Sequence, residues 1–180
     1  MNCRTTLLRI VALLAFTSQL SAQPRDDSPL AGRWSIDLTR STELSPWKTY
    51  DLTLSVMGDT VTVRRQLAWG RREFSDTMAL DLTRADNVVP VEMWPDNRHL
   101  GAYINSDKTK HVHASWLDGR RILRLSTDLV LQTQQGTRAV NILSDYKVSA
   151  SGAELTLTEL RSTRNRPIVY VFKHASASVP

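Results

Sequence analysis

Two histidines separated by one residue are the local feature of this sequence that most resembles a chemical site. His111 and His113 fall in a stretch where apolar and polar residues alternate. Residues i and i+2 of a strand point to the same face, so these two imidazoles could share a metal ion. Zinc needs a third ligand, and Glu92, His99 and Asp107 do not stand at a diagnostic spacing. We therefore keep the pair as weak metal candidates and expect two exposed histidines on a strand.

A second feature is a pair of opposite charges on predicted strands. Arg65 shares its alternation with the apolar residues of 61–67, and Asp76 shares its alternation with those of 74–82. A charge on a buried face needs a partner, so we expect Arg65 to pair with Asp76 across the hairpin. The hypothesis is a polar feature at the mouth of the fold, where a ligand could bind.

Aromatic residues add candidates for ligand contact. Trp34 and Trp116 alternate with polar neighbours, which predicts core positions. The irregular stretch 95–109 is interpreted as an ordinary long loop, with a lid over one end of the fold as the alternative. Aromatic side chains near loops are suited to a cavity rim. The ligand-facing aromatic residues are expected to be Trp69, Trp94 and Tyr103.

No motif points to catalysis. The chain has no Gly-x-Ser-x-Gly elbow and no Gly-rich phosphate loop. The basic residues fall in small clusters and are interpreted as a positive surface. We expect a protein that is not an enzyme and has no cofactor, although serines and histidines are numerous enough to leave a triad open.

The first 22 residues have the layout of a secretory signal peptide. Arg4 and Arg9 are followed by a short apolar run and a small residue, Ala22, at the expected cleavage site. We predict a signal peptide over 1–22, a flexible segment over 23–29, one domain over 30–174 and a flexible tail over 175–180. The mature protein is then expected to be secreted or periplasmic, with periplasm and exterior left open.

Removing that segment changes the composition. The single cysteine, Cys3, leaves with it, which excludes disulfides and cysteine-based sites in the remaining chain of about 158 residues. The net charge falls from +5 to +3, which does not favour nucleic acid as a partner. We expect no transmembrane segment in the mature chain.

Alternation with period two dominates residues 34–173 and predicts an all-β domain. Turn signals such as Met57-Gly58-Asp59 and Asp118-Gly119 separate the predicted strands. Sequential hairpins remove their edges by closing into a barrel. We predict an antiparallel up-and-down barrel of about 8–10 strands. A β-sandwich is the main alternative, and an outer-membrane barrel is disfavoured by charges on both faces.

The segment from Leu30 to Leu38, with Gly32-Arg33-Trp34 at its centre and Ser41 beyond it, resembles small secreted bacterial lipocalin-like proteins. Trp116-Leu117-Asp118-Gly119 and residues 149–156 also resemble that family. The resemblance covers most of 30–173 and implies a barrel that holds a small apolar ligand. It also implies that Gly32 and Trp34 close one end of the barrel beneath an arginine of the last strand, for which Arg161 is the nearest candidate.

The predicted function is therefore a secreted, lipocalin-like protein that binds a small hydrophobic or amphipathic ligand inside its barrel. The alternative is an envelope or extracellular interaction module with a solidly packed barrel. A metal-dependent or hydrolytic enzyme is a third possibility, and the oligomeric state is left open.

Overall fold

The computed structural model describes residues 28–44, 46–91, 103–104 and 106–175. The predicted signal peptide lies outside this part, as do Glu92, Trp94, His99 and the tail from 176 onward. The described residues form eleven strands and no helix, and so contain no helix that could cross a membrane. The strands are β1 Gly32–Ile36, β2 Thr49–Met57, β3 Thr60–Trp69, β4 Arg72–Asp81, β5 Asn87–Pro90, β6 Tyr103–Ile104, β7 Thr109–Leu117, β8 Ile122–Thr133, β9 Gly136–Val148, β10 Glu154–Arg161 and β11 Ile168–His174.

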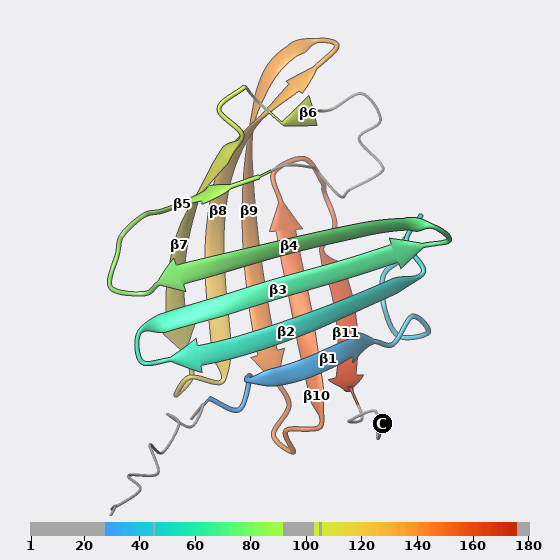
Figure 1. The fold of residues 1–180 in the computed structure, drawn as a ribbon, viewed down its shortest axis with the longest axis vertical. Helices are drawn as coiled ribbons and strands as arrows, with labels where there is room; N and C mark the ends of the chain where they lie inside the picture. The colour runs from blue at the N-terminus through green and yellow to red at the C-terminus, as the bar shows by residue number, and fades with distance from the viewer. Residues whose placement is uncertain (1–27, 45, 92–102, 105, 176–180) are drawn as a thin grey trace, which may run out of the picture.

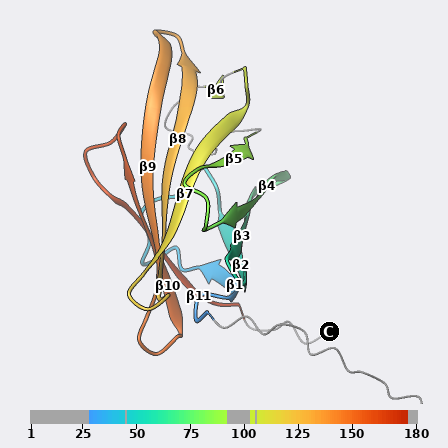
Figure 2. The same ribbon diagram turned by 90° about the vertical axis from the view of Figure 1, so that its left-hand side faces the viewer.

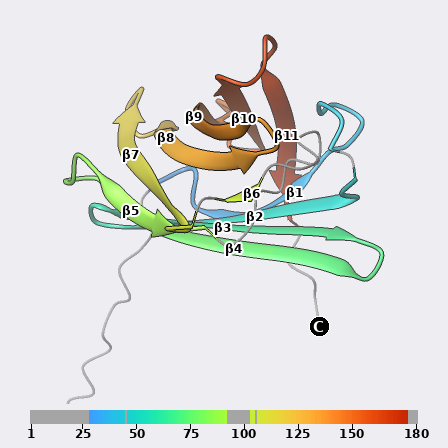
Figure 3. The ribbon, with the colours of Figure 1, turned by 90° about the horizontal axis from the view of Figure 1, so that it is seen from above.

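The strands form a nearly closed antiparallel barrel, which confirms the predicted fold class. The hydrogen-bonded order is β4-β3-β2-β1-β11-β10-β9-β8-β7-β5, with β6 added on β8. Two walls face each other, one made by β1 to β4 and the other by β7 to β11 (Figure 3). The β8–β9 hairpin projects beyond the rest of the barrel (Figures 1 and 2).

Turn chemistry sets the hairpins. Asp118 and Gly119 both have left-handed backbone, with φ of 50° and 60°, as this dipeptide favours between two strands. Gly58 has φ of 61° in the link between β2 and β3. Every residue from Thr49 to Met57 then has a partner in β3. The tight turn therefore fixes which face of each strand points inward.

The barrel is interrupted between β4 and β5. These two strands are the two ends of the hydrogen-bonded strand order. β5 pairs with β7 alone. Pro90 in β5 has no backbone N–H to donate, a property that suits a sheet edge. At the other end of β5 the side chain of Asn87 links the end of β4 to β7.

One end of the barrel is filled with apolar side chains. Trp34 is fully buried, and its indole N–H donates to the Leu30 carbonyl at 3.0 Å. The imidazole ring of His174 on β11 packs against the Trp34 ring, with 3.9 Å between the ring centroids. Gly32 has φ of 139°, and a Cβ there would lie 2.8 Å from His174 Cε1, so glycine is required by both backbone and space.

The expectation that Arg161 covers Trp34 is wrong. Lys173, next to His174, pairs with Glu154 at the start of β10, whereas Arg161 ends that strand. Seven residues of strand separate the two positions by about 23 Å. At the entry to β1, Ser28 is buried although it falls in the segment predicted to be flexible.

Ser41, part of the resemblance, ties the loop after β1 to the barrel. Its Oγ donates to the Asp37 carbonyl at 2.7 Å and accepts from the Val171 N–H at 2.9 Å.

A separate apolar cluster lines the projecting β8–β9 hairpin, and Ile104 packs against it. This upper apolar cluster consists of Leu129, Leu131, Val140 and Ile142.

Candidate functional site

Inward-facing residues change from apolar to polar partway along several strands. On β3, for example, Val61 and Val63 are followed in the same register by Arg65. On β10, Leu155 and Leu157 are followed by Glu159. We call this group the polar belt; it consists of Arg65, Asp76, Lys110, Ser144, Glu159 and Arg161.

Arg65 and Asp76 form the first part of the polar belt. They are direct neighbours across the β3–β4 ladder and form an ion pair, which confirms the predicted pairing. Their side chains are 16% and 17% exposed, and the guanidinium also lies 6.0 Å from the centroid of the Phe74 ring. Burial works against the charge of Arg65, but the carboxylate of Asp76, together with the nearby Tyr50 and Tyr146, raises the pKa of the guanidinium. Among the described residues, the buried Nε of Arg65 has no hydrogen-bond partner.

Lys110 on β7 completes this side of the belt. Its side chain is 9% exposed, and Nζ lies 3.8 Å from Asp76 Oδ2, beyond hydrogen-bond length. Burial, and then the nearby Arg65 charge, lower the pKa of Lys110 to about 8 against the raising effect of Asp76 and Glu159. The ammonium is therefore a poorly neutralised charge inside the barrel.

The opposite wall contributes a second ion pair. Glu159 and Arg161 are i and i+2 on β10, so both point inward. Glu159 Oε2 accepts from Arg161 Nη2 at 2.5 Å and from Nε at 3.1 Å. The two side chains are 8% and 10% exposed. Glu159 also lies directly across the ladder from buried Ser144 on β9.

Tyrosines line the same interior. Burial raises the pKa of Tyr50 and of Tyr146. The ring of Tyr50 meets Tyr170 and Phe172 edge-on at 5.7 and 5.1 Å. These rings connect the polar belt to the apolar end of the barrel.

Charges in the polar belt do not balance. In the part of the chain that the structure describes, three cations, Arg65, Lys110 and Arg161, face two carboxylates, Asp76 and Glu159. Each arginine has its own carboxylate, and the lysine shares the one already taken by Arg65. A low-dielectric interior makes such an excess positive charge attractive to an anion.

An opening leads toward this charge. A pocket of about 200 Å³ lies at the interruption between β4 and β5. Asp76 belongs both to this pocket and to the polar belt, so the opening reaches the interior charges. The other lining residues are Phe74, Ser75, Thr77, Pro90 and Val91.

Of the three aromatic candidates, the structure describes the side chain of Trp69. Trp69 ends β3, is 41% exposed, and has the guanidinium of Arg72 at 5.5 Å from its ring. The backbone of Tyr103 pairs with Gln132 in the projecting part of the barrel, and Trp94 lies outside the described residues. Ligand contact by these three residues stays a prediction.

His111 and His113 lie on the outer face of β7, as expected. His111 Nδ1 lies 2.7 Å from Asp86 Oδ2, and His113 Nδ1 lies 3.1 Å from the Ala85 carbonyl oxygen. Both rings thus fasten the β4–β5 turn to β7. Within the described ranges there is no group of three metal-ligating side chains, and the pair stays a weak metal candidate.

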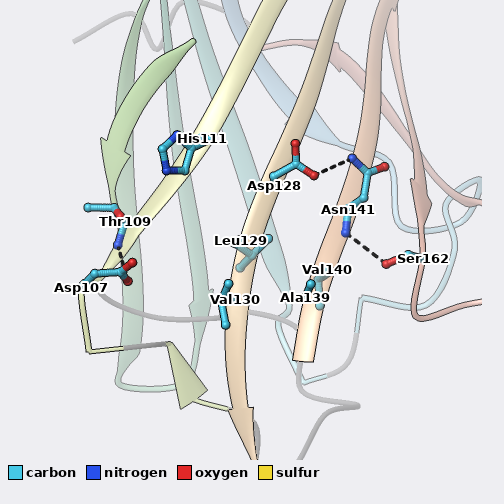
Figure 4. A pocket seen from close by; sticks show the side chains of 10 residues that line it. All are labelled: Asp107, Thr109, His111, Asp128, Leu129, Val130, Ala139, Val140, Asn141 and Ser162. Carbon is cyan, nitrogen blue, oxygen red and sulfur yellow. Dashed lines mark hydrogen bonds between the residues drawn. The ribbon is translucent and has the colours of Figure 1, made fainter. Parts of the chain in front are cut away.

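A second, outer pocket of about 380 Å³ lies on this side of the barrel (Figure 4). His111 lines it with Asp107, across from Asp128. The Asn141 amide donates to Asp128 at 3.0 Å, and the Asn141 backbone N–H donates to Ser162 Oγ at 3.0 Å. Within the pocket, the side chains of Asn141 and Asp128 thus bond to each other.

Three members of the polar belt, Lys110, Ser144 and Glu159, were not among the predicted site residues. Their signal was nonetheless present, since each shares the register of apolar neighbours. Lys110 precedes Val112 and Ala114 at period two, and Glu159 follows Leu155 and Leu157 in the same way.

No family model matches the sequence, and no curated protein matches it. Among solved structures, the fold is similar to the Schistosoma mansoni fatty acid binding protein in complex with arachidonic acid. That match has a TM-score of 0.51 and 11% identity, over 84% of this chain and 100% of that one. It supports the antiparallel β-barrel fold.

Two further matches have lower TM-scores. The Drosophila melanogaster brain fatty acid-binding protein gives 0.46 at 14% identity, over 80% of this chain and 98% of that one. The Ramazzottius varieornatus secretory abundant heat soluble protein 4 gives 0.49 at 9% identity, over 85% and 99%.

Proposed function

We propose that this protein is a carrier that binds an amphipathic anion inside its barrel. The acidic head group lies at the polar belt, and the apolar tail lies along the upper apolar cluster. The observation that carries the proposal is the unbalanced charge of the belt, where Lys110 has no carboxylate of its own among the described residues. An anionic head group would supply the missing negative charge in a setting where few water molecules compete for it.

The geometry of Arg65 supports the same ligand. Its Nε donor is buried without a partner among the described residues, and an unmet donor of this kind costs about 1–3 kcal/mol. A carboxylate accepts two parallel hydrogen bonds from a guanidinium. The head group would therefore accept a hydrogen bond from Arg65 Nε and would also neutralise the charge of Lys110.

The apolar side chains above the polar belt support an apolar tail as the rest of the ligand. The end of the barrel around Trp34 is filled by side chains, whereas the upper apolar cluster lies toward the projecting β8–β9 hairpin. A tail that leaves the belt in that direction stays in apolar contact. The fold-matched Schistosoma mansoni protein holds arachidonic acid, a carboxylic acid with a long apolar chain, and this supports the same ligand class.

Secretion is part of the proposal. Arg4, Arg9 and the apolar run that ends before Ala22 support export and cleavage. Intact mass measurement of the protein recovered from the periplasm or medium tests this. A mature chain that begins at Gln23 is the expected result, and retention of residues 1–22 would contradict it.

Binding is tested by displacement of a fluorescent fatty acid. Decanoate and its methyl ester form a matched pair, since they share the tail and differ in charge. We expect saturable binding of decanoate and binding of the ester that is at least about tenfold weaker, a difference of about 1.4 kcal/mol.

Variants locate the head group. Lys110→Met removes the unbalanced charge at nearly the same volume and should erase the preference for decanoate over the ester. The surface variant Lys108→Met, two residues away and exposed, should keep it. Absence of saturable binding by any probe would overturn the proposal and favour a barrel without a ligand.

A further inference from the structure

Lys110 combines two properties that are seldom found in one lysine. Its side chain is nearly buried among barrel residues, and its Nζ forms no close bond with Asp76, which lies 3.8 Å away and is held by Arg65. Buried lysines lose their proton more easily and act as nucleophiles or imine-forming groups in other proteins. The amine is thus available for chemistry that a reversible carrier does not use.

We propose that Lys110 captures amphipathic aldehydes as a covalent imine. The inference rests on the proposed function, because the aldehyde would enter the same interior with its tail along the same apolar surface. It goes further in assigning a reactive atom, Lys110 Nζ, and a second class of ligand that carries no charge before it reacts.

The step needs no oxidant, reductant or other partner. The Lys110 ammonium first loses a proton, and the free amine attacks the aldehyde carbon to form a carbinolamine. A proton returns as the carbinolamine loses water, which leaves a protonated imine, so that R–CHO and Lys–NH₃⁺ become R–CH=NH⁺–Lys and H₂O. One cation replaces another, and the carboxylate of Asp76 remains beside it.

The charge of the polar belt is therefore unchanged by the reaction. That differs from fatty acid binding, in which a new negative charge enters the belt. Burial also slows the return reaction, because hydrolysis of the imine requires water at a site that is largely closed to it.

The other four lysines provide internal controls. Lys48, Lys108, Lys147 and Lys173 are all exposed. An amine whose pKa is about 8 holds a few hundred times more free base at pH 7 than one near 10.5. A lower intrinsic nucleophilicity offsets part of this advantage, and we expect Lys110 to react at least about tenfold faster than the exposed lysines.

The test is reductive trapping. The mature protein is incubated with decanal and cyanoborohydride at pH 7. The modified lysine is then located by peptide mass mapping. Among the lysines, the expected result is one decyl group per chain, on Lys110; the N-terminal peptide is scored separately, because an α-amine also has an ordinary pKa of about 8. Lys110→Arg keeps the charge and should lose this label, whereas the matched variant Lys108→Arg should keep it.

Competition separates this inference from the proposed function. Decanoate should slow the labelling of Lys110 without slowing that of exposed lysines. Saturable decanoate binding with labelling spread equally over exposed lysines would overturn the inference and leave the proposed function standing. If decanoate binding is absent while Lys110 is still labelled selectively, the proposed carboxylate ligand is wrong and the reactive lysine is supported.

Discussion

The side-chain amide of Asn87 forms two hydrogen bonds with the backbone of Asp81. Its Oδ1 accepts from the Asp81 N–H at 2.8 Å, and its Nδ2 donates to the Asp81 carbonyl at 3.1 Å. The same Nδ2 donates to the Val112 carbonyl at 3.1 Å. One buried side chain thus joins β4 to β7 at the point where the regular ladder between β4 and β5 is missing.

Asn87→Ala should therefore destabilise the barrel. The substitution removes the hydrogen bonds to partly buried backbone groups of Asp81 and to the buried carbonyl of Val112, and we expect a loss of about 1–3 kcal/mol in the free energy of unfolding. Urea denaturation measures it. Asn141→Ala is the matched control on the exposed outer face, with an expected loss below about 1 kcal/mol. Equal effects of the two substitutions would contradict a closing role for Asn87.

Breaking the Arg65–Asp76 pair from one side should cost more than removing both partners. Asp76→Leu leaves Arg65 and Lys110 facing each other without their shared carboxylate, and we expect a loss of about 3 kcal/mol. The double variant Arg65→Met/Asp76→Leu should recover most of this loss. Urea denaturation of the three proteins gives the coupling. A double variant less stable than Asp76→Leu would rule out this account of the pair.

The lowered pKa of Lys110 predicts that the stability of the protein depends on pH. Its folded pKa of about 8 lies below the unfolded value of 10.5, so the unfolded chain binds more protons between these values. Stability contributed by this group is thus present above 10.5 and is lost as pH falls toward 8. The charged groups facing it are Arg65, Asp76 and Glu159.

Relative to Lys110→Met, the protein should gain up to about 3 kcal/mol between pH 8 and 10.5. Chemical denaturation at several pH values measures this difference. The affinity for decanoate should fall over the same range, because the carboxylate stays ionised while the lysine loses its charge. If the free energy of unfolding of the two proteins changed with pH in the same way, the pKa of Lys110 would not be lowered by folding.

His111 should titrate above its ordinary value. The hydrogen bond with Asp86 raises the pKa of His111, and the charges of Asp86, Asp107 and Asp128 add to the effect. The pair thus contributes stability below pH 6.5 that is lost as pH rises through the folded pKa. NMR titration of the imidazole measures the midpoint directly. Asp86→Asn should lower that midpoint, and an unchanged midpoint would exclude Asp86 as the cause.

Local signals in the sequence predict much of this fold. The alternation in 50–56 and 61–67 identifies β2 and β3, and the Asp118–Gly119 turn identifies the hairpin of β7 and β8. Alternation also assigns Arg65 and Asp76 to the inside, because a tight turn fixes their relative register. These predictions depend on neighbours in the chain, and they are confirmed.

Features that depend on distant strands were not predictable in the same way. The ring over Trp34 comes from His174 and not from Arg161, because the stagger of β11 against β1 and β10 decides which residue reaches it. The encounter of Lys110 with Asp76 depends on how the barrel curves between β4 and β7. Alternation places each side chain inside, but it does not say which strands meet across the interruption.

The pairing of β1 with β11 also governs how the chain reaches its native state. Trp34 lies opposite His174, 140 residues later, and β1 joins β2 to β4 with the strands from β7 to β11. Contacts of such sequence separation are slow to form because a long loop must close first. A ribosome-bound chain can form its hairpins one by one, but the barrel cannot close until the last strand has emerged from the exit tunnel.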